Sequence, residues 1–164
     1  MNNKNFIFLL VAFTLCVNSA TAQDVIRQKS CDNVAIKRQA DSVKVAMAKD
    51  GYTVIREASM AMESEYEMPV IVPLNDGSWY HVVFIGDESS RLLELRMYDW
   101  QEKQIIYQKS KNDRITDSDG RNDNILDYIY APKFSEYHMI KPVQINKKKK
   151  KEVCGYIMLF KRTK

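Results

Sequence analysis

Residues 52–161 consist of short runs of β-branched and aromatic residues, separated by clusters of Gly, Asn, Asp, Pro and Ser. Runs of this kind are typical of β-strands, and such boundaries are typical of turns. Eight strands at this spacing indicate an antiparallel sandwich or a barrel, and we predict a mainly β, eight-stranded sandwich. The predicted strands cover residues 52–60, 68–74, 78–86, 91–98, 104–108, 125–131, 136–145 and 153–161.

Two polar stretches predict how some of these strands are joined. Asp76-Gly77 lies between two apolar runs and predicts a hairpin, because Gly tolerates the positive φ of a tight turn. Residues 99–103 form a second polar connection. Residues 79–85 and 154–160 are apolar on both faces, so we expect them to be central strands covered by a second sheet or a helix.

An amphipathic helix is predicted over residues 30–50, because apolar residues recur there at steps of three and four. Those residues are Ile36, Ala40, Val43 and Met47. Ser30 or Asp32 is expected to cap the start of the helix, and Gly51 to follow its end. We therefore divide the mature chain into a helical segment at 23–51 and a β-sandwich domain at 52–164.

The first 22 residues have the pattern of a cleavable signal peptide: a basic residue, an apolar run and an Ala20-Thr21-Ala22 site. A bacterial lipoprotein acylated at Cys16 is the alternative, but Leu15 stands where that motif needs a small residue. Cleavage after Ala22 predicts a secreted or periplasmic protein with no transmembrane segment in its mature form.

The charge balance of the mature chain argues against nucleic-acid binding. Removing Lys4 with the signal leaves 24 basic and 21 acidic residues, a net charge of +3. Five consecutive lysines, from Lys147 to Lys151, supply this excess. They form either a solvated hairpin loop or a surface that attracts an anionic polymer or lipid.

Two cysteines remain after cleavage, Cys31 and Cys154. In an oxidising compartment we predict that they form a disulfide, which would tie the N-terminal segment to the last strand. Two free thiols are the alternative, because cysteines this far apart in sequence need not meet.

Few residue patterns point to catalysis. His81 and His138 lie inside predicted strands with apolar neighbours, so we interpret both as hydrogen-bonded structural residues. The chain contains neither a zinc-binding motif nor a G-x-S-x-G nucleophile motif. Alternating Glu63, Glu65 and Glu67 are interpreted as a solvated edge or loop. We therefore predict that the protein is not an enzyme.

Two places suggest binding instead. Asp117, Asp119 and Asp123 alternate around a glycine and could supply oxygen ligands to Ca²⁺, although the full EF-hand pattern is missing; the alternative is a polar loop without a cofactor. Trp100, next to a polar turn and close to Tyr98, could stack on a sugar or a peptide, or pack over the sheet edge.

The chain resembles the bacterial pre-peptidase C-terminal domain, a jelly-roll-like β-sandwich attached to many secreted enzymes. The matching stretches are 77–84 (GSWYHVVF), 93–99 (LELRMYD), 124–132 (NILDYIYAP) and 135–139 (SEYHM). The resemblance implies an accessory role without catalytic residues, and calcium or polymer binding in some relatives. Glu136 departs from the Gly that the family often has at this place.

From these features we expect an exported, non-enzymatic binding or accessory module of the bacterial cell envelope, with a protein or polysaccharide as its partner. A small secreted hydrolase or hydrolase inhibitor is one alternative. An envelope-surface protein that binds anionic polymer or lipid through the lysine run is another.

Overall fold

The computed structural model describes residues 29–111, 124–146 and 152–163. Within these residues lie eight antiparallel strands in two sheets and one helix, so the predicted mainly β sandwich with an N-terminal helix is confirmed. The elements are α2 (Val34–Lys49), β1 (Tyr52–Met62), β2 (Val70–Leu74), β3 (Tyr80–Ile85), β4 (Ser90–Tyr98), β5 (Gln104–Lys111), β6 (Ile125–Tyr130), β7 (Glu136–Asn146) and β8 (Val153–Arg162).

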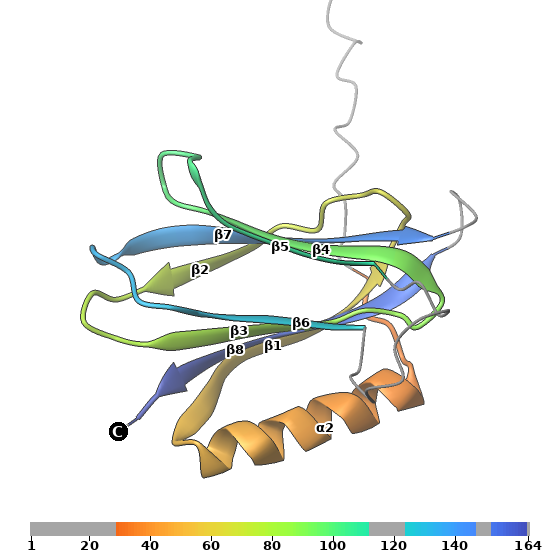
Figure 1. The fold of residues 1–164 in the computed structure, drawn as a ribbon, viewed down its shortest axis with the longest axis horizontal. Helices are drawn as coiled ribbons and strands as arrows, with labels where there is room; N and C mark the ends of the chain where they lie inside the picture. The colour runs from red at the N-terminus through yellow and green to blue at the C-terminus, as the bar shows by residue number, and fades with distance from the viewer. Residues whose placement is uncertain (1–28, 112–123, 147–151, 164) are drawn as a thin grey trace, which may run out of the picture.

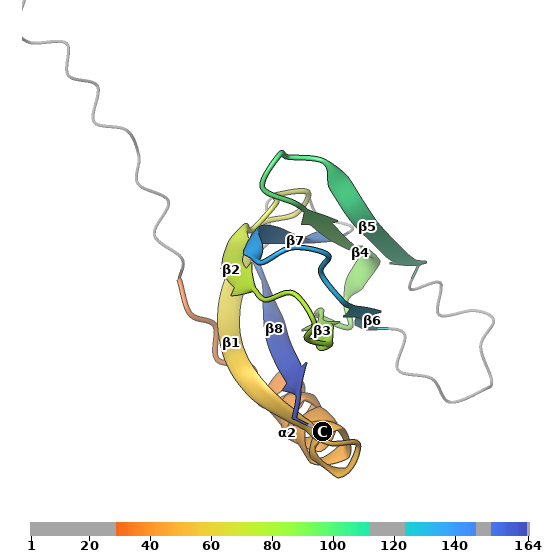
Figure 2. The ribbon, with the colours of Figure 1, turned by 90° about the vertical axis from the view of Figure 1, so that its left-hand side faces the viewer.

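The two sheets lie face to face, and the helix lies against the outer side of one of them (Figure 1). Sheet A has the strand order β1-β8-β3-β6, and sheet B has the order β2-β7-β4-β5. A second view, turned by 90°, shows the helix below sheet A, on the side that faces away from sheet B (Figure 2). The predicted central strands, β3 and β8, occupy the middle of sheet A.

Strand alternation sends every second side chain into the space between the sheets. In β3, Tyr80, Val82 and Phe84 point into this core, and the residues between them point toward the helix. Leu93 and Leu95 of β4 meet them from sheet B. All five side chains are almost completely buried and belong to the larger of the two apolar clusters, which fills the space between the sheets.

The helix buries its apolar stripe on the outer face of sheet A. Ile36 and Ala40 are the helix residues with the least exposure, and Val43 and Met47 extend the stripe. They pack against a second apolar cluster on sheet A, made of Tyr52, Val83, Ile85, Met158 and Phe160. No helix in the described part of the chain is long and apolar enough to cross a membrane.

The predicted N-cap of the helix is wrong. Asn33 caps α2, because its Oδ1 accepts hydrogen bonds from the backbone N–H groups of Ala35 and Ile36 at 3.0 and 3.2 Å. Asp32 pairs instead with Lys37 at 2.5 Å. Gly51 follows the helix with a φ of +80°, as a C-terminal glycine is expected to do.

The hairpin predicted at Asp76-Gly77 is also wrong. Gly77 has the expected positive φ, but β2 pairs with β7 in sheet B, whereas β3 pairs with β6 and β8 in sheet A. The turn therefore carries the chain from one sheet to the other. In contrast, residues 99–103 join β4 and β5, which pair with each other as a true hairpin.

Candidate ligand-binding site

A cavity of about 170 Å³ opens on the outer side of sheet B, where the β4–β5 turn reaches over the neighbouring strands. This turn extends beyond the edge of sheet B at the upper left in Figure 1. The lining comes from β2, β7 and the turn, and consists of Ile71, Asp99, Trp100, Glu102, Tyr137, His138 and Met139. Three segments far apart in sequence thus form one surface.

Two aromatic rings dominate this cavity. The centroids of Trp100 and Tyr137 lie 6.0 Å apart, with their planes tilted by 47°. Trp100 is 70% exposed and Tyr137 is 54% exposed, so both rings present most of their faces to solvent. Other large apolar side chains of the domain are also exposed, and what distinguishes this pair is its position beside a cavity.

The side chain of Asp99 restrains the β4–β5 turn that carries Trp100. The Oδ1 of Asp99 accepts hydrogen bonds from the backbone N–H groups of Gln101 and Lys103, at 3.0 and 2.9 Å. The backbone N–H of Asp99 donates to the carbonyl of Lys103 at 3.0 Å, and Glu102 has a φ of 60°. These bonds restrain the turn and so limit the conformational entropy that Trp100 would lose on binding a ligand.

The cavity is acidic. Asp99 and Glu102 both line it, and Glu136 precedes the lining residue Tyr137 in sequence. The pKa of Tyr130 is raised, first by burial and then by the negative charges of Glu136 and Asp99.

Of the two aromatic residues predicted for binding, the cavity includes Trp100 but not Tyr98. The Lys141 ammonium lies over the Tyr98 ring, 4.8 Å from its centroid, and the Tyr98 hydroxyl donates to Gln104 Oε1 at 3.2 Å. Sequence reasoning missed Tyr137. Its only sequence signal is its position in β7, where alternation points it away from the core next to the buried His138.

A network of charges covers the sheet B surface next to the cavity. Arg96 contacts the carboxylates of Glu94 and Glu67, and Lys141 pairs with Glu67 at 2.9 Å. The Tyr107 hydroxyl also donates to Glu94, at 3.0 Å. The hydrogen bond from Lys141 lowers the pKa of Glu67 most, with Arg96 adding to the effect. The sequence suggested that Glu67 is simply solvated. In the structure it is ion-paired instead.

Both histidines are hydrogen-bonded, as the sequence predicts. His81 Nε2 lies 2.7 Å from Asp127 Oδ2, and this bond lowers the pKa of Asp127. His138 is buried, with Nε2 3.2 Å from the Tyr130 hydroxyl and Nδ1 3.3 Å from the carbonyl of Glu136. Each imidazole is thus held by its neighbours in the sheets.

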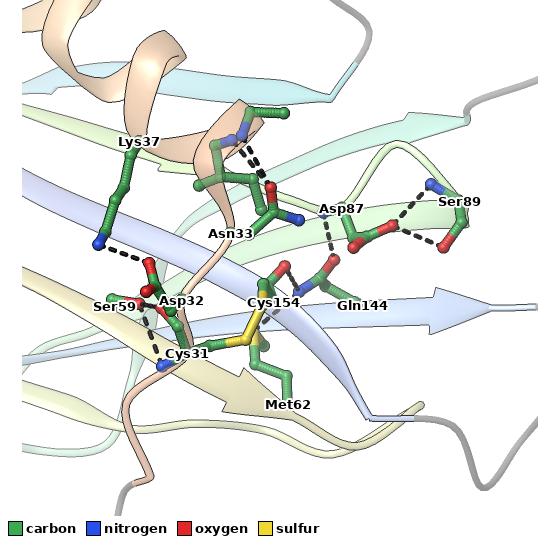
Figure 3. Close-up of a disulfide and its surroundings, with 12 residues drawn as sticks. Cys31, Asp32, Asn33, Lys37, Ser59, Met62, Asp87, Ser89, Gln144 and Cys154 are labelled. Carbon is green, nitrogen blue, oxygen red and sulfur yellow. Dashed lines mark hydrogen bonds and ion pairs between the residues drawn. A yellow bond between two sulfur atoms is a disulfide. The ribbon is translucent and has the colours of Figure 1, made fainter.

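Cys31 and Cys154 form a disulfide on the outer side of sheet A, with their Cα atoms 5.6 Å apart (Figure 3). The segment before α2 is held there by further bonds to β1. Ser59 Oγ accepts from the N–H of Cys31 at 3.2 Å and donates to its carbonyl, and Ala61 N–H donates to the Lys29 carbonyl at 2.8 Å.

Two predicted sites cannot be placed. Asp117, Asp119 and Asp123 lie outside the described residues, as does the run from Lys147 to Lys151. Within 29–111, 124–146 and 152–163, no group of three or more His, Cys, Asp or Glu side chains is arranged to hold a metal ion. The strands that flank the lysine run, β7 and β8, belong to different sheets, so they do not form the expected hairpin.

Comparisons with known proteins give little beyond the architecture. No family model and no curated protein matches the chain. One similar solved structure, described as "CBM4 structure and function", has a TM-score of 0.37 and 13% identity, over 65% of this chain and 74% of that chain. Another, the "Glycosylation Associate Protein (Gap123) complex from Streptococcus agalactiae", has a TM-score of 0.34 and 11% identity, over 69% and 40%. Likenesses this distant carry no functional argument.

Proposed function

We propose that this protein is a non-enzymatic binding module of the bacterial cell envelope, and that its ligand is a glycan held against Trp100 and Tyr137. The observation that carries the proposal is the exposed ring pair, 6.0 Å apart, beside a cavity lined by two carboxylates. An accessory role, as the pre-peptidase C-terminal resemblance implies, is part of the same proposal.

The chemistry of the cavity suits a sugar ring. One face of a pyranose presents C–H groups, which pack on an aromatic ring, while its hydroxyls donate hydrogen bonds around the rim. Trp100 and Tyr137 offer the ring faces, and Asp99 and Glu102 offer acceptor oxygens. The cavity is smaller than the roughly 300 to 1,000 Å³ of pockets that enclose drug-sized ligands. It would therefore contact one side of a sugar unit and leave the rest of a chain in solvent.

The same residues argue for binding without hydrolysis. Glycosidases use two carboxylates that flank the scissile bond from opposite sides. Asp99 and Glu102 come from a single turn, and one oxygen of Asp99 already accepts two backbone hydrogen bonds. The two histidines are engaged by Asp127, Tyr130 and the carbonyl of Glu136.

Export is supported by two independent features. The first 22 residues have the signal-peptide pattern, and a disulfide joins Cys31 to Cys154. Disulfides persist in oxidising compartments such as the periplasm and are rare in the cytoplasm. We therefore include a secreted or periplasmic location in the proposal, where envelope and environmental glycans are within reach.

The test is a glycan array probed with residues 23–164, followed by affinity electrophoresis with the glycans that bind. Trp100→Ala should weaken binding by about 2 kcal/mol, roughly thirtyfold, which is typical of a tryptophan at the centre of a contact surface. Tyr137→Ala should weaken it by a smaller factor.

Trp79→Ala is the matched control, because Trp79 is 51% exposed but does not line the cavity. It should bind as the unmodified protein does. A protein that binds no glycan, or one in which Trp79→Ala and Trp100→Ala are equally harmful, would contradict the proposal.

A further inference from the structure

The charge of the cavity restricts the class of ligand more than the shape of the cavity does. Asp99 and Glu102 are the two carboxylic acids that line it. Among the described residues, no ion pair involves either of them, whereas two bases on the adjacent sheet surface are engaged by carboxylates. Lys141 pairs with Glu67 at 2.9 Å, and Arg96 contacts Glu67 and Glu94.

The two aromatic rings favour the same kind of ligand charge. The face of a tryptophan or tyrosine ring carries negative electrostatic potential and attracts a cation lying over it. Trp100 and Tyr137 expose such faces next to the two carboxylates.

We propose that the glycan bound here carries protonated amines, as the amino sugars of a deacetylated polymer do. The inference rests on the proposed glycan-binding function and narrows it from glycans in general to cationic ones. The sugar ring would pack on Trp100, and its ammonium group would lie between the ring faces and the carboxylates of Asp99 and Glu102. An anionic glycan would be repelled at the same place.

The test compares two ligands that differ only at the amine: oligomers of glucosamine, and oligomers of N-acetylglucosamine of the same length. Isothermal titration in mildly acidic buffer keeps the amines of the first protonated, while the second is neutral. The glucosamine oligomer should bind at least tenfold more tightly. Asp99→Asn and Glu102→Gln should each weaken its binding about fivefold, the factor for the roughly 1 kcal/mol that two charges at contact distance exchange in water.

Both variants keep the shape of the site. An asparagine at 99 still offers Oδ1 to the N–H groups of Gln101 and Lys103, so the turn stays closed. Each variant keeps one acceptor oxygen for a sugar hydroxyl, so the affinity for the neutral N-acetylated oligomer should fall by a smaller factor than the affinity for the glucosamine oligomer. Glu63→Gln, which removes the same charge from the β1–β2 connection outside the cavity lining, is the control and should leave both affinities unchanged.

Each outcome is decisive. If the two oligomers bind with equal affinity, and Trp100→Ala abolishes the binding of both, the amine inference is overturned and the glycan proposal stands. A loss in Glu63→Gln as large as in Asp99→Asn would mean that net charge and not the cavity attracts the ligand. Binding of neither oligomer would also overturn the inference, and the array would then decide the glycan proposal by itself. A lysine-rich peptide that competes as well as the glucosamine oligomer would overturn the assignment to a glycan.

Discussion

Gln144 offers the sharpest test of how the two sheets are joined. Its side chain has no exposed surface, and all four of its hydrogen-bonding positions are used. Oε1 accepts from the N–H of Asp87 at 2.8 Å and from Ser90 Oγ at 2.9 Å. Nε2 donates to the Cys154 carbonyl at 3.0 Å and to Met62 Sδ at 3.1 Å. A residue of sheet B thus bonds to β1, to β8 and to the β3–β4 turn (Figure 3).

Gln144→Leu keeps the volume and removes these bonds. The N–H of Asp87 and the hydroxyl of Ser90 lose their acceptor, and each buried polar group left unpaired costs about 1 to 3 kcal/mol. The leucine recovers about 1 kcal/mol through apolar burial. We therefore expect the free energy of unfolding to fall by about 1 to 5 kcal/mol, a large part of the roughly 5 to 15 kcal/mol that a domain has.

Gln144→Glu adds a dependence on pH. Burial disfavours the carboxylate, so the pKa of a glutamate at 144 is raised in the folded state above its unfolded value of about 4.3. A raised folded pKa means stability that is complete below the unfolded pKa and lost as the pH rises. The variant should thus come closest to the unmodified protein at about pH 4, and lose about 1.4 kcal/mol per pH unit above that until its folded pKa is reached.

The assay is urea unfolding of residues 23–164, followed by far-ultraviolet circular dichroism at about pH 4 and about pH 7. Gln108→Leu and Gln108→Glu are matched controls, because Gln108 is exposed on β5. They should change the unfolding free energy by less than about 0.5 kcal/mol. The reasoning is refuted if Gln144→Leu behaves like Gln108→Leu, or if the deficit of Gln144→Glu is the same at both pH values.

Two further predictions concern the cross-links of the domain. Replacing both Cys31 and Cys154 by serine should lower the unfolding free energy by up to about 5 kcal/mol in the chain-entropy model, because the bond closes a loop with a sequence separation of 123. Urea unfolding of the variant measures this loss, and a loss below about 1 kcal/mol would contradict the prediction. The pKa of Glu67 is lowered chiefly by Lys141, so the stability it contributes is present above its unfolded pKa of about 4.3 and lost as the pH falls through its folded pKa. At neutral pH, Glu67→Gln should therefore be less stable than the unmodified protein, by under about 1 kcal/mol because Glu67 is partly exposed. In strong acid the two proteins should be equally stable. Thermal melts from neutral to acidic pH measure the difference in stability, and a difference that persists in acid would exclude the ion pair as its cause.

The strands and the helix follow from local patterns, and this explains why they were predicted well. The residues of β3 are mostly apolar on both faces of the strand. This pattern predicts a strand covered on both sides, and so a central one, without knowledge of its neighbours. The stripe from Ile36 to Met47 likewise identified the buried side of α2. The helix cap was missed because Ser30, Asp32 and Asn33 are all good capping residues, and only the backbone geometry chooses Asn33.

The candidate site could be predicted only in part, because it depends on which strands become neighbours. Asp76-Gly77 predicts that the chain reverses there, but not whether the next strand joins the same sheet, and it joins the other one. Trp100 and Tyr137 are 37 positions apart in the chain and meet because β4 and β7 pair, with Tyr98 opposite Met139. Glu67 meets Lys141 for a similar reason. No local signal contains these pairings.

The bond between Cys31 and Cys154 also determines how the protein would respond to mechanical force. Tension applied to the chain before Cys31 and after Cys154 would pass from sulfur to sulfur and bypass most of the fold. β2, β4 and β7, which carry the cavity, lie inside the covalent ring and would not be stretched. The part of β8 beyond Cys154 lies in the path of the force, so the strands around the cavity would carry no load until β8 separated from β1 and β3.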